Sequence, residues 1–188
     1  MGRIIATVTT YVALLRAVNV GGRSPVSMAA LREFAADLGF ERPQTLLQSG
    51  NLVFGAPATK TSSLERLLEA EASTRLGLDT NIVVRSAAEW HLVIGRNPFP
   101  AEAETDPSHL LVMALKGPMK AGAVDALQAS IKGRETVRGA GTHLYLVYPD
   151  GIGRSRLTAA VIERAVATTG TARNWNTVLK LETLAASR

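Results

Sequence analysis

Apolar and polar residues alternate along this chain with two different spacings, which favour strands in some segments and helices in others. Residues 10–18 form a short run of apolar and β-branched side chains, which is typical of a buried strand. In residues 27–38 the apolar positions recur every three or four residues, which indicates an amphipathic helix. Ser27 is placed to cap this helix and Gly39 to end it.

The rest of the first half continues in the same manner. Apolar runs on both sides of Ser49-Gly50 predict a hairpin. Ser62 with Glu65, and Ser86 with Glu89, have the spacing of capping boxes that open two further helices. The expected elements are strands at 45–48 and 51–54, a helix at 62–76, a strand at 81–85 and a helix from 86.

The second half repeats this order of elements. We expect a strand at 109–115, a helix at 121–131, hairpin strands at 135–138 and 142–148, a helix at 155–167, a strand at 171–173 and a closing helix at 175–185. The order β-α-β-β-α-β is the ferredoxin-like arrangement. The sequence therefore predicts an α+β protein made of two tandem ferredoxin-like halves that arose by internal duplication, although residue identity between the halves is slight.

Proline and acidic residues separate these two halves. We expect an N-terminal ferredoxin-like half with a trailing helix in residues 1–96 and a linker in residues 97–107. A C-terminal ferredoxin-like half with a closing helix then occupies residues 108–188.

Composition narrows the class of protein. Of the 188 residues, 46% are hydrophobic and 20% are charged, so the chain can bury a core and is not of a disordered type. It has no cysteine, which excludes disulfides, thiol nucleophiles and zinc–thiolate sites. No apolar run reaches the roughly 18 residues that a membrane span requires. The apolar segment 4–15 imitates a signal peptide, but Arg16 interrupts it and no cleavage site follows. We therefore expect a cytoplasmic protein.

The net charge of +5 is distributed unevenly. Residues 132–180 contain eight basic and three acidic side chains, whereas basic and acidic side chains balance before residue 132. Such an excess favours an anionic partner. The alternative is a basic surface that is merely solvated.

A glycine-containing turn lies inside this basic region. It follows the apolar run that ends at Tyr148 and precedes a helical pattern. Backbone N–H groups and arginines in such a turn can bind a phosphate. The alternative is a plain strand-to-helix turn in which Ser155 caps the helix. The candidate ligand-binding residues here are Gly151, Gly153, Arg154, Ser155 and Arg156.

A second polar cluster precedes the closing helix. Arg173 could hold phosphate, Trp175 could stack on a base, and Asn174 and Asn176 could bind amide or base edges. The alternative is structural, with Asn176 or Thr177 capping the helix and Trp175 packing into the core.

Two segments of the first half complete the candidates. The first, at the end of the strand at 10–18 and in the turn after it, resembles the glycine-containing turn in composition and could bind a second anion. The alternative is a loop in which Arg16 pairs with a carboxylate. The second segment, residues 48–51, is most simply a tight hairpin, and its side-chain amides matter for binding only if they face Arg16. The candidates are Arg16, Asn19, Gly21, Gly22, Gln48, Ser49 and Asn51.

No catalytic group can be assigned. His143, Asp150 and Ser155 lack the sequence context of a hydrolase triad. His91 and His109 have no partners at metal-ligand spacing. We therefore expect no metal and no cofactor.

Five segments resemble one family. They are VALLRAVNVGG (12–22), QSGN (48–51), NPF (97–99), YPDGIGRSRL (148–157) and RNWNTV (173–178). The chain resembles, over roughly residues 11–184, the bacterial family catalogued as domain of unknown function 1697. The resemblance implies two related ferredoxin-like halves and no established activity. Ala17 stands where the family usually has glycine, which argues against an obligatory positive φ there. Arg156 stands where lysine is usual, which keeps the charge and alters the hydrogen-bond geometry.

Three functional hypotheses follow. The first is binding of a phosphate-bearing ligand, either a nucleotide or a nucleic-acid backbone, at a basic cleft where the candidate turns converge. The low aromatic content, 5%, argues against base stacking on a sheet. The second is a small enzyme acting on an anionic metabolite, with Ser155 or Tyr148 handling a proton. The third is a structural or interaction protein without a ligand; no pattern indicates a membrane partner or an oligomeric state.

Overall fold

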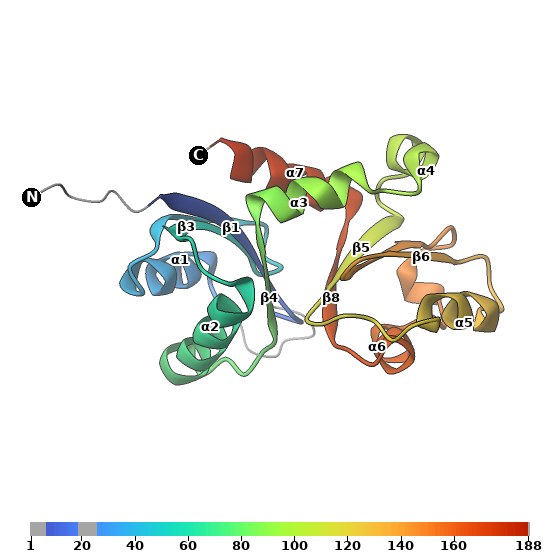
Figure 1. Cartoon of the computed structure of the whole chain (residues 1–188), viewed down its shortest axis with the longest axis horizontal. Coiled ribbons are helices and arrows are strands. Elements are labelled where there is room, and N and C mark those ends of the chain that lie inside the picture. The colour runs from blue at the N-terminus through green and yellow to red at the C-terminus, as the bar shows by residue number, and fades with distance from the viewer. Residues whose placement is uncertain (1–6, 19–25, 188) are drawn as a thin grey trace, which may run out of the picture. The chain divides into compact units, whose positions relative to one another are not determined.

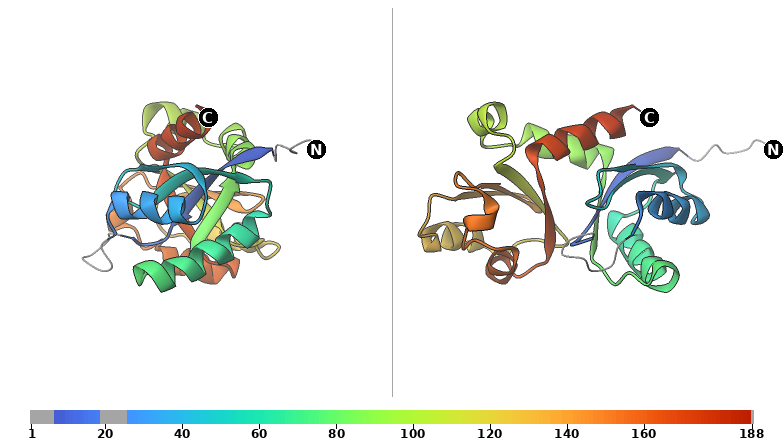
Figure 2. Two further views of the ribbon diagram at one scale, coloured as in Figure 1. Left: turned by 90° about the vertical axis from the view of Figure 1, so that its left-hand side faces the viewer. Right: turned by 180° about the vertical axis from the view of Figure 1, so that it is seen from behind.

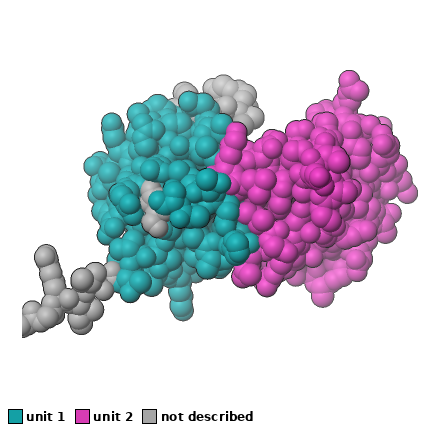
Figure 3. All heavy atoms as spheres, turned by 90° about the horizontal axis from the view of Figure 1, so that it is seen from above, with its two compact units in different colours: residues 1–91, 181–188 teal, residues 92–180 magenta. Residues whose placement is uncertain are grey.

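Two four-stranded antiparallel sheets, each covered by helices, make up this mixed α+β protein (Figure 1). The computed structural model describes residues 7–18 and 26–187. The chain divides into two compact units, residues 1–91 with 181–188 and residues 92–180 (Figure 3). No helix in the described part of the chain combines the length and the apolar character needed to cross a membrane.

The first unit is built around the central strand β1. Its elements are β1 (Val8–Leu15), α1 (Met28–Asp37), β2 (Glu41–Leu46), β3 (Asn51–Pro57), α2 (Thr61–Leu76) and β4 (Ile82–Ser86), and the strand order is β2-β3-β1-β4. Helices α1 and α2 cover the same face of this sheet (Figures 1 and 2). Alternate β1 residues, Tyr11, Ala13 and Leu15, pack in the core with both helices, while Val12 and Leu14 are buried on the other face. Burial on both faces explains why this segment reads as a continuous apolar run.

The second unit has the same strand order, β6-β7-β5-β8. Its elements are α4 (Pro100–Thr105), β5 (Leu110–Leu115), α5 (Ala123–Ser130), β6 (Thr136–Ala140), β7 (His143–Val147), the 3₁₀ helix η1 (Ile152–Arg154), α6 (Ala159–Val166) and β8 (Gly170–Asn174). Helices α5 and α6 lie on one face of the sheet (Figures 1 and 2). The segment 97–107, which we expected to be a linker, contains α4.

Helices α3 (Ala87–Gly95) and α7 (Trp175–Ala186) each contribute residues to both units. In the first unit, Nδ1 of His91 lies 2.7 Å from Oε1 of Glu182. The capping box that opens α3 is confirmed. Ser86 N donates to Glu89 Oε2 at 2.7 Å, and Glu89 N donates to Ser86 Oγ at 3.2 Å.

Of the caps predicted for α1 and α2, one is confirmed and the other is not. Ser27 caps α1 as predicted, because its Oγ accepts from Ala30 N at 3.0 Å. The capping box predicted at Ser62 is wrong. Helix α2 follows Lys60, and Glu65 turns to β4, where its Oε1 accepts from Val84 N at 2.9 Å and lies 3.6 Å from Arg85 Nη1. A buried carboxylate without hydrogen-bond donors is costly in free energy, and this cost exceeds what Glu65 would gain by capping α2.

The expectation for Ala17 is also wrong. This residue follows β1 in the left-handed region, with φ 52°. A β-carbon makes that region unfavourable by about 1–2 kcal/mol. Ala17 therefore adopts a backbone conformation that glycine would adopt without strain.

Candidate functional site

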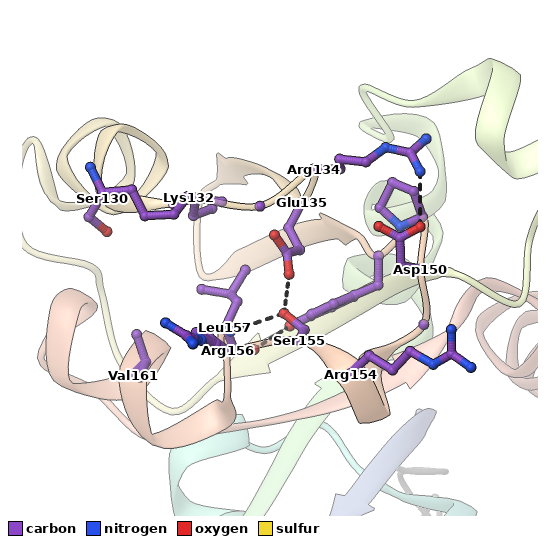
Figure 4. A pocket seen from close by; sticks show the side chains of 15 residues that line it. Ser130, Lys132, Arg134, Glu135, Asp150, Arg154, Ser155, Arg156, Leu157 and Val161 are labelled. Carbon is purple, nitrogen blue, oxygen red and sulfur yellow. Dashed lines mark hydrogen bonds and ion pairs between the residues drawn. The ribbon is translucent and has the colours of Figure 1, made fainter.

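A pocket of about 520 Å³ opens between two loops of the second unit (Figure 4). The first loop, residues 130–135, joins α5 to β6, and the second, residues 148–157, joins β7 to α6. Val161 of α6 completes the lining. The second loop is the glycine-containing turn that the sequence indicated.

Two polar contacts join these loops. The hydroxyl of Ser155 donates to a carboxylate oxygen of Glu135. Arg134 Nη1 lies 2.9 Å from Asp150 Oδ1 in an exposed ion pair. Figure 4 shows Glu135 and Ser155 facing each other in the middle of the pocket, with the Arg134–Asp150 pair at one end.

The backbone of the second loop is largely bonded to itself. The N–H groups of residues 151, 154, 155 and 158 donate to carbonyl oxygens within the turn, and that of Leu157 donates to Ser155 Oγ at 3.0 Å. Gly151 has φ 83°, a conformation that favours glycine. With these N–H groups engaged, the side chains provide most of the donors that an incoming anion would meet.

The alternative in which Ser155 caps the following helix is wrong. Helix α6 begins four residues later, after Thr158, whose Oγ1 accepts from Val161 N at 3.4 Å. Ser155 itself is extended, with ψ 144°. Its hydroxyl is thereby available to Glu135 rather than to a helix terminus.

Positive charge lies at both ends of the pocket. Lys132, Arg154 and Arg156 are exposed lining residues. Across residues 7–18 and 26–187, no carboxylate pairs with Arg154 or Arg156. Arg154 extends toward the end that holds Asp150, and Arg156 toward the end that holds Val161 (Figure 4). These guanidinium groups can form charge-assisted hydrogen bonds to an anion.

Two ionisable groups in the pocket have shifted pKa values. Hydrogen bonds from Ser155 and from its own backbone N–H lower the pKa of Glu135, so this carboxylate is ionised at neutral pH. Burial, together with the charge of Glu135, raises the pKa of Tyr148 to about 12. Tyr148 therefore stays protonated, and its hydroxyl donates to Leu157 O at 3.0 Å.

The cluster before the closing helix does not line this pocket. Ala172 packs in the core with α5 and α6, so its neighbour Arg173 points to the other face of the sheet. Arg173 is 8% exposed and donates to Thr171 Oγ1 at 2.7 Å and to Ala172 O at 2.8 Å. Burial lowers the pKa of Arg173 to about 10.

Asn174 caps α7, rather than Asn176 or Thr177, the two residues that the structural alternative named. Asn174 Oδ1 accepts from Thr177 N at 3.0 Å and from Thr177 Oγ1 at 2.9 Å. Trp175 is buried, which confirms its packing into the core, whereas Asn176 is exposed. The structural alternative therefore named the wrong residue but the correct role, because one polar residue of this cluster does cap the helix.

The first unit brings two candidate segments together. Leu15 N donates to Gly50 O at 2.8 Å, which places Arg16 beside the turn that contains Gln48. Asn51 is fully buried and holds this turn, with Nδ2 donating to Leu46 O at 2.7 Å and to Ser49 Oγ at 3.0 Å. Gln48 is exposed. The candidates Asn19, Gly21 and Gly22 lie outside the described residues.

Sequence reasoning missed the first loop of the pocket, and Glu135 in particular. The available signal was the hairpin. Thr136 pairs with Val147 across β6 and β7, so the residue before β6 and the residue after β7 lie side by side. Aligning the two predicted strands would therefore have placed Glu135 opposite Tyr148. In the part of the chain that the structure describes, no group of three His, Asp or Glu side chains could hold a metal ion.

Comparison with known proteins adds the family and the fold. The family model described as "Protein of unknown function (DUF1697)" matches residues 8–145. No curated protein matches the sequence. Among solved structures, the conserved bacterial protein SP0830 from Streptococcus pneumoniae is similar in fold, with a TM-score of 0.75 and 20% identity. That similarity covers 96% of this chain and 99% of the other.

Proposed function

The chain belongs to the family described as "Protein of unknown function (DUF1697)", and we propose that its second unit binds a small phosphate-bearing ligand in the pocket between residues 130–135 and 148–157. The observation that carries this proposal is the pair Arg154 and Arg156. Both are pocket-lining cations without a carboxylate partner among the described residues. Arginine forms strong, directional hydrogen bonds with phosphate oxygens.

The size of the pocket favours a small molecule over a nucleic-acid backbone. A volume of about 520 Å³ lies within the range of roughly 300–1,000 Å³ that is usual for small-molecule sites. The aromatic residues of the sheets also argue against RNA bases stacking there, because Tyr11, Phe54 and Tyr145 are all buried. Binding of a single-stranded oligonucleotide in preference to any small phosphate ester would contradict this choice.

A thermal-shift screen with nucleotides, sugar phosphates and inorganic phosphate tests the proposal. A ligand that binds the folded state must raise the melting temperature. We expect affinity for the best ligand to fall at least about tenfold in the double variant Arg154→Ala/Arg156→Ala. Arg164→Ala is the matched control, because Arg164 is an exposed arginine of α6 outside the pocket. Equal binding by the double variant and the control would exclude this site.

A second candidate function, catalysis on an anionic metabolite, is favoured by one contact. The hydroxyl of Ser155 donates a hydrogen bond to the Glu135 carboxylate, as a nucleophile does toward its general base. However, the lowered pKa makes Glu135 a weak base. The hydroxyl of Tyr148 already donates to Leu157 O, so its proton is not directed at a substrate. Binding without turnover is therefore the stronger proposal. Phosphorus NMR of a bound ester over several hours separates the two, since loss of the ester signal would favour the enzyme.

We also propose that both units are ferredoxin-like and arose by duplication. The shared strand order supports this proposal. A second support is the alignment of equivalent residues. Val12 of β1 pairs with Arg85 of β4, and Val112 of β5 pairs with Arg173 of β8. Each of these arginines donates from Nη1 to the carbonyl of the preceding residue at 2.8 Å.

A further inference from the structure

We infer that the ligand of this pocket is a phosphate ester of a hydroxylated carbon skeleton, such as a sugar phosphate or a nucleotide, and that its hydroxyl groups donate to Glu135. This inference rests on the proposed phosphate-binding function and adds the chemistry of the ligand body. It is drawn from the order of charges along the pocket: cations lie at both ends, Glu135 lies between them, and, of the described lining residues, the one carboxylate at an end, Asp150, is paired with Arg134 (Figure 4).

The position of Glu135 limits where a phosphate can lie. Like charges within a few ångströms repel each other, and Glu135 is ionised at neutral pH. The phosphate therefore belongs at a cationic end, near Arg154 or Arg156. The part of the ligand that occupies the middle of the pocket must carry no negative charge.

The same carboxylate requires hydrogen-bond donors. An ionised carboxylate only accepts hydrogen bonds, and it offers about four lone-pair sites. Ser155 occupies one of them with its hydroxyl group, and the backbone N–H of Glu135 occupies another. An apolar group placed against the remaining sites would strip water from the carboxylate without replacing its hydrogen bonds. A ligand hydroxyl replaces them, as ribose hydroxyls do on acidic residues of dinucleotide-binding sites.

The surrounding residues favour hydroxyl donors over an ammonium group. Lys132, Arg154 and Arg156 give the lining an excess of positive charge that would repel a cationic ligand body. Leu157 and Val161 add apolar lining at the end where Arg156 lies, against which a carbon skeleton can pack (Figure 4). A neutral, hydroxylated skeleton satisfies both features.

The test compares three probes by isothermal titration calorimetry with the full chain. Ribose 5-phosphate carries the hydroxyls, cyclopentylmethyl phosphate has a similar ring and phosphate without hydroxyls, and inorganic phosphate has no carbon skeleton. We expect the wild-type protein to bind ribose 5-phosphate at least about tenfold more tightly than cyclopentylmethyl phosphate. Equal or reversed affinities for the two esters would overturn the inference. The proposed phosphate binding would still be supported if both esters bind the wild-type protein and neither binds Arg154→Ala/Arg156→Ala. If no probe binds, the proposed function fails together with the inference.

Glu135→Gln gives opposite expectations for two of the probes. Binding of ribose 5-phosphate should weaken about tenfold, because a charge-assisted hydrogen bond is lost. Binding of inorganic phosphate should stay equal or strengthen, because a repelling charge is removed. A parallel loss of both affinities would indicate a purely structural role and overturn the inference. Ser155→Ala serves as a second variant that keeps the carboxylate, and it should retain the preference for ribose 5-phosphate.

Discussion

The hydroxyl of Ser155 donates a hydrogen bond to the carboxylate of Glu135, a residue that lies 20 positions earlier in the chain. The same oxygen of Ser155 accepts from Leu157 N. One side chain thus fixes the shape of its own loop and ties that loop to the preceding one. The pair crosses the middle of the pocket (Figure 4), and it places a negative charge in a lining where basic side chains outnumber acidic ones.

Ser155→Ala should lower the free energy of unfolding by about 1 kcal/mol, the size expected for a partly exposed bond to a carboxylate. Because the pKa of Glu135 is lowered in the folded protein, the contribution of this bond is fully present above the unfolded pKa of about 4.3. It is lost as the pH falls through the lowered pKa. Urea unfolding at several pH values measures the difference.

Ser62→Ala is the control for this prediction. Ser62 is an exposed serine near the start of α2, and the predicted capping box there is not formed. Its removal should change the free energy of unfolding by less than about 0.5 kcal/mol. A gap between wild type and Ser155→Ala that widened at low pH would contradict the assignment.

Ala17→Gly should stabilise the protein by about 1 kcal/mol, because glycine adopts a positive φ without strain. Ala17 is exposed, so no packing is lost. Ala29→Gly is the matched control, since it places glycine in the exposed part of α1 and should destabilise by about 1 kcal/mol. Thermal unfolding of both variants decides the matter, and a lower melting temperature for Ala17→Gly would count against the positive φ.

Glu65→Ala should destabilise the first unit by about 3 kcal/mol or more, because it removes a buried carboxylate that accepts from Val84 N and faces the charge of Arg85. Burial already lowers the pKa of Arg85, and Glu65 opposes that shift. Glu71→Ala removes the exposed pair with Arg75 and should cost less than about 0.5 kcal/mol. Chemical denaturation should separate the two variants clearly; similar costs would show that the buried pair is not needed.

Asn174→Ala should cost about 1 kcal/mol, the usual effect of removing a helix N-cap. Asn176→Ala, two residues further on and exposed, should have almost no effect on stability. The two variants distinguish the observed cap from the cap at Asn176 that the sequence left open as an alternative. A larger loss in Asn176→Ala, measured by circular dichroism during heating, would refute the assignment.

Local patterns predicted most elements of the fold. The strands at β1, β4 and β5 were expected from apolar runs, and the Ser27 cap and the Ser86–Glu89 box from short motifs. These features depend on residues that lie close together in the sequence. The predictions that failed concern polar side chains with a choice of partners, such as Glu65, which serves Val84 and Arg85 instead of a helix start.

The candidate site was predicted in part. The sequence indicated the loop that carries Arg154, Ser155 and Arg156, because its glycines and arginines are adjacent in the chain. It did not indicate Glu135, which joins the loop only through the pairing of β6 with β7. It also grouped Arg173 with the anion-binding residues, whereas the alternation of side chains along β8 directs Arg173 to the other face of the sheet.

The sequence alone determined the order of most helices and strands, the excess of positive charge in the second half and the glycine-containing turn within it. Periodicity, caps and turns are properties of neighbouring residues, which is why the sequence determines them. Only the tertiary structure decided which polar side chains meet. Hydrogen bonds between residues as distant as 135 and 155 depend on strand register and loop path, and a buried polar group takes whichever partner the packed chain brings within reach.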